Sequence, residues 1–493
     1  MRLFPQCFLA WSLVLTFCSC KSFYRARSRI EETKFAQLEN SISPFVVFSS
    51  QRQKFSIAER MRHYRVPGLM LAIIDQGEIV FLKSYGVKDN QSNDAVNNST
   101  IFQAASVSKP ITAIGALSLV DRGLLHLDSD INVFLKSWKL PDSTFTIDEK
   151  VTLRQILSHT AGLSVGGFLG YRTDERVPAA IDVLAGLGNS SPVVVDAVPK
   201  SRTRYSGGGY VIAQVMMEDV SGQPFAAFMK RNILAPLAME NSSYAQPLPL
   251  ALKKKAALGH FADGAMVPGG YYIYPELGPA GLWANAEDLA KVIIAIQKSY
   301  LGMKNTMPLS QATVKEMLTR QGERFGLGPK IETKDKHLIF EHNGSNVGYK
   351  ASWMGFLDQK DTGILHSGGI VALTNGDNGF HLIEEIVSAI GENMAWQFLV
   401  KEKKEMPFKP LTEKERAMAG IFDKNGEEIF ITENDGILNF WGHEIYKVND
   451  FNFVSGTGHH NSFKLSDDLN TIEVDVTFGK QKEFLVLKRK QTR

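Results

Sequence analysis

Apolar and polar positions along the chain predict strands at the front, helices in the middle and strands again behind them. The stretch 69–86, "LMLAIIDQGEIVFLKSYG", contains two apolar runs around "DQG" and predicts a β-hairpin. From Phe102 the sequence runs "FQAASVSKPITAIGALSLVDRGLL", which predicts a mostly apolar helix that ends near Gly123. A buried lysine is costly, so Lys109 in the first turn of this helix requires an explanation.

Further periodic segments complete this part of the chain. "VTLRQILSHTAGL" predicts a second helix stopped by Gly162, and "YVIAQVMMEDVSG" predicts another helix with a glycine stop. "NAEDLAKVIIAIQKSY" predicts a helix with Asn285 as its N-cap. Strand-like runs return at "KASWMGFL" and "GGIVALTN". This order of elements predicts one α+β domain over residues 46–400.

A change in composition marks a second domain. The stretch "KEKKEMPFKPLTEKER" is charged and contains two prolines, which predicts a linker over residues 401–416. Beyond it, short apolar runs alternate with turn signals such as "KNGE", "ENDG" and "SDDL". This regular spacing predicts a small antiparallel β-domain or barrel over residues 417–493.

The first twenty residues, "MRLFPQCFLAWSLVLTFCSC", have a basic start, an apolar middle and a small residue before Cys20. This layout predicts a secretory signal peptide, and its end resembles a bacterial lipoprotein signal in which Cys20 is lipidated. Lipidation at Cys18, an ordinary cleavage site and a short membrane anchor remain open. Residues 21–45 are polar and charged and predict a tether. From these features we expect an exported bacterial protein, in the periplasm or at the outer membrane, with an N-terminal lipid anchor.

Composition excludes several classes of function. The chain has 493 residues, 22% of them charged, and a formal net charge of +3. That balance, without a dense basic stripe, gives no sign of nucleic-acid binding. All three cysteines lie within the signal segment, so the remaining chain has no disulfide, no thiolate nucleophile and no cysteine metal site. Past the signal, no apolar run is long enough to span a bilayer.

The "SVSKP" segment is the first candidate for catalytic chemistry. Proline is tolerated in the first turn of a helix, so Pro110 places the helix start close to Ser106. Residues three apart share a helix face, so the Lys109 amine can reach the Ser106 hydroxyl. A desolvated lysine has a lowered pKa and, in its neutral form, accepts a proton from serine. The alternative is a surface serine and lysine at an ordinary helix start.

Two further segments carry candidate site residues. "RTRYSGGGY" places Tyr205 just before a run of glycines, and a tyrosine beside a serine and lysine can relay a proton to a leaving group. "FEHNGSNVGYKASWMGF" places His342 and Gly344 ahead of the strand-like run, where a basic group could face a carboxylate and a backbone N–H could polarise a carbonyl. Each has a structural alternative, namely a packed tyrosine and a structural histidine.

Together, in this order, the three segments resemble the serine β-lactamase and penicillin-binding-protein superfamily. Its pattern is S-x-x-K, then Y-x-N, then K-T-G or H-x-G, and the branch concerned contains class C β-lactamases, D-alanyl-D-alanine carboxypeptidases and esterases. The resemblance covers about residues 50–395 and includes "LSHTAGL" and "GPAGLWANAEDLAK". It implies an antiparallel sheet flanked by helices with an all-helical subdomain, and it requires no cofactor and no metal.

The resemblance also implies a role for each matched residue. Ser106 is the expected nucleophile, Lys109 its activating partner and Tyr205 the proton shuttle, and whether lysine or tyrosine is the working base stays open. The backbone N–H groups of Ser106 and Ser345 form the expected oxyanion hole.

The remaining matched positions are expected to contact substrate or to be structural. Gly207, His342, Asn343 and Gly344 are the expected substrate-binding positions. His159 in "SHTAGL" is interpreted as a structural residue at a helix end.

Departures from the family pattern concern the substrate. Gly207 stands where the pattern has asparagine, so the side-chain amide that would hold a β-lactam is missing. His342 stands where β-lactamases have lysine, and histidine is only partly charged at neutral pH. We therefore expect weak β-lactamase activity at most.

The leading hypothesis is a serine hydrolase that forms an acyl-enzyme from a small-molecule or peptide substrate, either an ester or an amide such as a D-amino-acid peptide. The nucleophile elbow G-x-S-x-G and the zinc motif H-E-x-x-H are absent from the chain. The alternative is a cell-envelope binding or regulatory protein that keeps the fold without turnover. Because all three catalytic positions are occupied, the enzyme is favoured.

Overall fold

The computed structural model describes residues 35–48, 54–358, 367–406, 409–424, 427–434, 436–440, 443–455, 460–478 and 481–490. The predicted signal segment with Cys20, and the predicted tether up to residue 34, lie outside the described residues. The described residues fall into two compact units, one within 1–60 and 385–408 and the other within 61–384 and 409–493. A search of the described part of the chain finds no helix long and apolar enough to cross a membrane.

The first unit is small. Strand β1 (Val46–Phe48) pairs in parallel with β10 (Lys404–Met406), which lies within the stretch expected to be a linker. A buried ion pair joins the Arg60 guanidinium to the Glu385 carboxylate through two hydrogen bonds of 2.8 Å each. Such a two-pronged contact fixes both side chains in one geometry.

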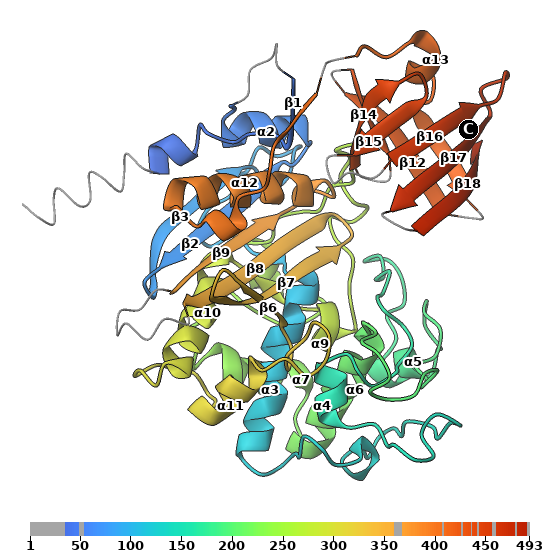
Figure 1. Cartoon of the computed structure of the whole chain (residues 1–493). Helices are drawn as coiled ribbons and strands as arrows, with labels where there is room; N and C mark the ends of the chain where they lie inside the picture. The colour runs from blue at the N-terminus through green and yellow to red at the C-terminus, as the bar shows by residue number, and fades with distance from the viewer. Residues whose placement is uncertain are drawn as a thin grey trace, which may run out of the picture. The chain divides into compact units, whose positions relative to one another are not determined.

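A six-stranded sheet with every neighbouring pair antiparallel forms the centre of the second unit, in the order β3-β2-β9-β8-β7-β6 (Figure 1). The predicted hairpin is confirmed as β2 and β3, and the two later strand-like runs are β8 and β9. The strand bounds are β2 Gly68–Asp75, β3 Glu78–Gly86, β6 Lys330–Lys334, β7 His337–Asn346, β8 Tyr349–Asp358 and β9 Ser367–Thr374. A separate short pair joins β4 (Phe102–Gln103) to β5 (Trp283–Ala284).

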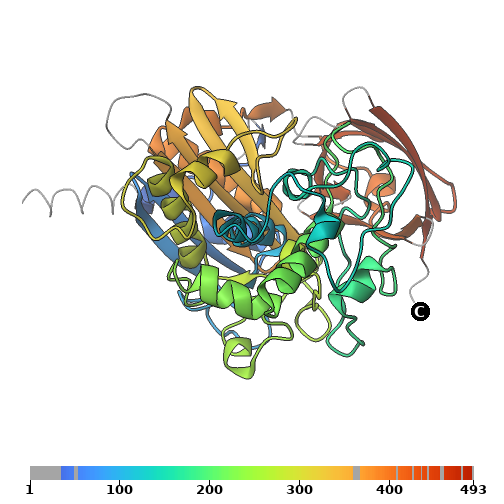
Figure 2. The ribbon, with the colours of Figure 1, turned by 90° about the horizontal axis from the view of Figure 1, so that it is seen from below.

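Helices gather beneath this sheet in the view of Figure 1, and they lie in front of it when the molecule is seen from below (Figure 2). The predicted N-cap of α10 is confirmed, since the Asn285 side chain accepts from the backbone N–H of Asp288. The α-helix bounds are α2 Ile57–His63, α3 Ser108–Asp121, α4 Leu153–Leu157, α5 Ala180–Leu184, α6 Gly207–Ser221, α7 Phe225–Met229, α8 Leu250–Lys253, α9 Leu277–Ala280, α10 Ala286–Tyr300, α11 Gln311–Met317, α12 Gly379–Met394 and α13 Glu413–Arg416. The remaining turns are η1 Ala105–Val107, η2 Ile131–Val133, η3 Lys230–Leu234 and η4 Gln397–Leu399.

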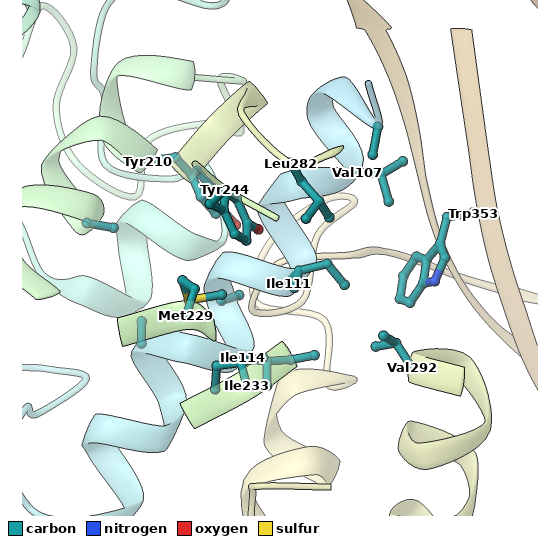
Figure 3. Packing of buried hydrophobic residues seen from close by; sticks show 14 of the residues in the cluster. Val107, Ile111, Ile114, Tyr210, Met229, Ile233, Tyr244, Leu282, Val292 and Trp353 are labelled. Atoms are coloured by element: carbon teal, nitrogen blue, oxygen red, sulfur yellow. The ribbon is translucent and has the colours of Figure 1, made fainter. Parts of the chain in front are cut away.

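Helix α3 lies in the middle of the core. Its residues are buried from Ser108 to Leu119, as expected of a helix that is apolar on all sides. Figure 3 shows Ile111 below Leu282 and pointing toward Trp353 of β8, while Ile114 faces Met229 and Ile233. Position 115 has to be small, because a Cβ on Gly115 would lie 2.6 Å from the Met229 sulfur. The structure thus packs α3 on every side, including the side that carries Lys109.

Two local predictions need correction. The helix expected over 151–163 is only α4, because the chain leaves the helix at Ser158 and His159 has a positive φ of 60°. His342 and Gly344 were expected to precede a strand. They lie within β7 itself, and the strand predicted after them is its hairpin partner β8.

The C-terminal strands form a closed, eight-stranded antiparallel barrel, as expected of a small β-domain. Apolar side chains such as Phe422, Phe453 and Phe463 fill its interior, so it is a packed core. The strands are β11 Gly420–Lys424, β12 Glu427–Asn434, β13 Ile437–Phe440, β14 His443–Asn449, β15 Asn452–Ser455, β16 His460–Leu465, β17 Thr471–Phe478 and β18 Gln481–Arg489.

One buried carboxyl group has no hydrogen-bond partner among the described residues. Glu276 directly precedes α9, its side chain is fully buried, and neither of its carboxylate oxygens is paired. Burial raises the pKa of Glu276 to about 7, because removal from water disfavours the charged form. The folded state therefore holds a proton there that the unfolded chain loses at lower pH.

We predict that Glu276→Gln makes the protein more resistant to unfolding at high pH. The carboxyl of the unfolded chain ionises near its usual pKa of 4.5, whereas in the folded state it ionises near 7. The wild type therefore loses stability as pH rises through this window, by on the order of 3 kcal/mol in total, and the neutral variant does not. Urea unfolding of both proteins at pH 5 and pH 8 measures the difference. If the unfolding free energies of wild type and variant differ by the same amount at both pH values, Glu276 is already ionised in the folded protein at pH 5.

Candidate active site

Ser106 lies in a short turn between a strand and the central helix. Strand β4 leads into η1, which contains Ser106, and α3 begins two residues later, so the serine precedes the helix. The preceding Ala105 has a positive φ of 49°, a conformation that is costly for a residue with a side chain. Ser106 keeps some exposure while Ala105 and Val107 are buried. The strained turn thus presents one hydroxyl at the edge of a packed core.

Lys109 lies one turn further on and contacts this serine. Its Nζ is 2.9 Å from Ser106 Oγ and donates to the carbonyl oxygen of Pro279 at 3.1 Å. The side chain is 2% exposed, and burial lowers the pKa of Lys109 to about 7. A neutral amine keeps two N–H bonds and one lone pair. It can therefore donate to Pro279 and accept a proton from Ser106 at the same time.

Tyr205, from a segment far along the chain, packs against the Lys109 amine. Its ring lies 4.8 Å from Lys109 Nζ, and the nearby Ser106 side chain slightly favours the ionised form of its hydroxyl. Burial outweighs this effect and raises the pKa of Tyr205 to about 12. At neutral pH this phenol carries its proton, whereas the amine of Lys109 is close to half neutral.

His159 has a contact that the sequence interpretation did not include. Its ring lies 4.4 Å from the Tyr205 ring, and its Nδ1 accepts the backbone N–H of Ser206. Because a backbone N–H can only donate, the proton of a neutral His159 resides on Nε2. Burial holds its pKa well below the usual value, with Lys109 and His342 adding to the effect. His159 is thus a neutral residue at a helix end, as interpreted, and it also supports Tyr205.

The register of the sheet directs one backbone N–H toward the serine. Asn346 and Tyr349 close a two-residue turn between β7 and β8 and so form a hydrogen-bonded pair. The next pair, Ser345 with Lys350, is therefore of the non-hydrogen-bonded kind, and the Ser345 N–H points away from β8. On that side β6 reaches only as far as Glu341. The Ser345 N–H is thus directed to an open edge of the sheet.

Gly344 brings this edge against the nucleophile turn. A Cβ at position 344 would lie 2.2 Å from the carbonyl oxygen of Ala104 and 3.2 Å from the Ala105 Cβ. Only glycine allows this approach without a shift of the backbone. The expected oxyanion pair, Ser106 N–H and Ser345 N–H, therefore comes from two segments in direct contact. The Asn343 and Ser345 side chains are exposed on the opposite face of β7.

His342 is a neutral acceptor and provides no cation. Its Nδ1 lies 2.7 Å from the carbonyl oxygen of Asn343, which places the ring proton on Nδ1 and leaves Nε2 as a lone pair. Within the described residues, Nε2 is buried without a partner. Burial lowers the pKa of His342 to about 3, with nearby Lys109 as a further cause. The expected partial charge at neutral pH is therefore absent.

Gly207 begins α6 and is covered by an aromatic ring. A Cβ at this position would meet the Phe168 ring at 2.9 Å and the carbonyl oxygen of Gly166 at 3.1 Å. The preceding loop is fixed here because the Gly207 N–H donates to Gly166 and the Ser206 hydroxyl donates to Ser164. Phe168 thus occupies the direction in which a side chain at position 207 would point.

The structure therefore brings Ser106, Lys109, Tyr205 and His342 together and lays the 344–345 backbone beside them. Sequence reasoning missed Pro279, Phe168 and Phe325, whose ring lies 4.7 Å from His159. No chemical signature marks these positions, since a carbonyl oxygen and two apolar rings act here only through their place in the fold. Among the described residues, no cluster of three or more His, Cys, Asp or Glu side chains could hold a metal ion.

Comparisons with known proteins agree with this geometry. The Beta-lactamase family model matches residues 56–386. Esterase EstB of Burkholderia gladioli is 27% identical over 269 residues, which is 48% of this chain and 68% of the esterase. Penicillin-binding protein 4* of Bacillus subtilis (strain 168) is 23% identical over 368 residues, covering 71% of this chain and 76% of that protein.

Among solved structures, the octameric penicillin-binding protein homologue from Pyrococcus abyssi superposes with a TM-score of 0.58 at 21% identity. The match covers 88% of this chain and 98% of the archaeal chain. At this identity the likeness shows the fold alone. The family and its named relatives support hydrolase activity of the serine type. With two thirds of the sequence matched by the family model, this chain belongs to the Beta-lactamase family.

Proposed function

We propose that the protein is a serine hydrolase in which Ser106 attacks an ester or amide carbonyl and forms an acyl-enzyme. The observation that carries the proposal is the 2.9 Å contact between Ser106 Oγ and the buried Lys109 amine, whose pKa is about 7. A serine hydroxyl is a weak nucleophile unless a nearby base takes its proton. A lysine that is largely exposed could not do this at neutral pH, because it would be charged.

Acylation follows from the arrangement of donors and acceptors. Neutral Lys109 accepts the Ser106 proton as Oγ attacks the carbonyl carbon. The carbonyl oxygen gains negative charge and is held by the Ser106 and Ser345 N–H groups. Tyr205, still protonated, donates its proton to the leaving alcohol or amine and takes a proton back from the Lys109 ammonium, which returns the amine to its neutral form. A water molecule then attacks the carbonyl carbon of the acyl-enzyme. The proton transfers run in reverse, and Ser106 is released as the free hydroxyl.

The pKa values distinguish the two candidate bases. At pH 7 a group with a pKa of about 7 is half deprotonated, whereas one with a pKa of about 12 is almost entirely protonated. Lys109 therefore acts as the base that activates Ser106, and Tyr205 acts as the acid toward the leaving group.

Two features of the site favour uncharged substrates. Neutral His342 offers no positive charge to a substrate carboxylate, and glycine at 207 offers no amide to an acylamino group. Phe168 also lines a pocket of about 540 Å³ with a mixed lining, which includes Leu169 and Val194 as well as Asn189 and Asp196. Esters and neutral amides are thus the proposed substrates and β-lactams are poor ones, and the relation to Esterase EstB supports an ester.

We predict that a fluorophosphonate ester labels the wild type at Ser106, whereas Ser106→Ala takes up no label. Lys109→Met should fold and label at least about 100-fold more slowly, because the hydroxyl loses its base. Labelling of the wild type should rise with pH through about 7, as the amine becomes neutral. Intact-mass spectrometry against time measures all three.

Ser118→Ala is the control, since Ser118 is a buried serine within α3 whose hydroxyl donates to the Gly115 carbonyl, away from the proposed site. It should label like the wild type. Adduct formation on Ser106→Ala at the wild-type rate would exclude Ser106 as the nucleophile. A wild type that reacts with no ester or phosphonate would favour the binding or regulatory alternative.

We predict that substitutions at positions 207 and 168 have non-additive effects on stability. Gly207→Asn introduces a side chain against Phe168 and should destabilise the protein by about 1–3 kcal/mol through overpacking. Phe168→Ala removes the obstructing ring, so the double variant should recover most of the loss that the asparagine causes. Thermal unfolding of the wild type, both single variants and the double variant gives the coupling. Strictly additive losses would mean that the ring and position 207 do not compete for the same space.

A further inference from the structure

Asn346 joins three segments that build the proposed site. Its side chain is 6% exposed, and its Nδ2 donates to Gln103 Oε1 at 2.7 Å and to the Ala280 carbonyl at 3.2 Å. Gln103 is itself fixed, since its Nε2 donates to the Tyr272 carbonyl at 2.7 Å. One amide group thus links β7, β4 and α9.

Each of these three segments carries part of the chemistry. Gln103 ends β4, and the chain continues from it through Ala104 into the turn with Ser106. Ala280 follows Pro279, whose carbonyl accepts from Lys109. Asn346 itself follows Ser345, whose N–H is directed to the open edge. The nucleophile, the acceptor of the base and the oxyanion donor are therefore each one to three residues from an end of this network.

We propose that Asn346 is a positioning residue that holds the nucleophile turn, the lysine's acceptor and the oxyanion strand in register. The inference rests on the proposed hydrolase function and assigns Asn346 no contact with substrate. Strand pairing cannot supply this register, because β4 and α9 are not paired with β7. The Gly344 contact limits how close β7 comes to Ala104, and the Asn346 amide fixes its position along the strand.

A small error in this register is costly for catalysis. The two oxyanion donors come from different segments and have to converge on one oxygen atom, and a misplacement of about 1 Å costs on the order of 100-fold in rate. Helix α9 also contributes to the burial of the Lys109 amine, because the Pro279 carbonyl accepts a hydrogen bond from it. If α9 loosens, water reaches the amine and its pKa rises toward that of an exposed lysine.

Tyr349 provides a matched structural control. It is the cross-strand partner of Asn346, and its hydroxyl also serves two buried carbonyl acceptors, Ala257 at 2.8 Å and Gly270 at 3.3 Å. Neither acceptor belongs to the nucleophile turn or to α9. Tyr349→Phe therefore removes a comparable buried donor from the same hairpin without touching the network.

The experiment measures phosphonate labelling of the wild type, Asn346→Ala, Asn346→Asp and Tyr349→Phe in the full chain, each shown by circular dichroism to be folded. Saturation kinetics separate the maximal labelling rate from the probe concentration at half saturation. For Asn346→Ala we expect the maximal rate to fall about 10- to 100-fold, with little change in half saturation. The midpoint of its pH profile should move upward from about 7. Asn346→Asp should be as slow or slower, because its carboxylate faces two acceptors.

Tyr349→Phe should lower the melting temperature as Asn346→Ala does and keep the wild-type labelling rate and pH midpoint. The proposal is overturned if folded Asn346→Ala labels as fast as Tyr349→Phe, or if both variants slow equally with unchanged pH midpoints. Failure of the wild type itself to label contradicts the hydrolase function instead, so the two outcomes are distinguishable.

Discussion

Burial of one lysine amine is the constraint on which the rest of the site depends. Helix α3 is packed on all sides, and Lys109 projects from it into an environment that disfavours charge. The cost of that burial is relieved when the amine is neutral and hydrogen-bonded, and Ser106 and the Pro279 carbonyl provide those contacts. The same packing that stabilises the domain therefore produces a base that is available near neutral pH. A surface lysine beside the same serine would have no such property.

The fold converts this base into a site by bringing distant segments against it. Ser106 is held in a strained turn, and Tyr205, two residues before α6, lies over the amine. Gly344 lets the open end of β7 approach the turn. Two neutral histidines also line the site. His159 packs against the Tyr205 ring, and His342 provides an uncharged hydrogen-bond acceptor. Among the described residues, burial alone shifts the pKa of Lys109, and no carboxylate raises it. This uncharged surrounding also accounts for the proposed preference for neutral substrates.

Much of the arrangement follows from local sequence patterns, and the remainder depends on tertiary contacts. Pro110, the apolar run and Asn285 are local signals, and the elements they predict are present. The brevity of α4 and the placement of His342 inside β7 were missed. His159 leaves the helix with a positive φ although it is not a glycine, and β7 continues up to the two-residue turn after Asn346. The neutrality of His342 likewise depends on its burial and on the proximity of Lys109, which no motif encodes. Phe168 and Asn346 carry no chemical signature of their own.

The most direct test of this account is a titration of Lys109 itself. Carbon NMR of protein with lysine labelled at Cε gives the ionisation of each amine, and the Lys109→Met spectrum identifies the signal that belongs to this residue. The account predicts a pKa of about 7 for Lys109, while exposed lysines titrate near 10. A Lys109 signal that titrates with the exposed lysines would contradict it, because an amine charged at neutral pH cannot take the proton of Ser106.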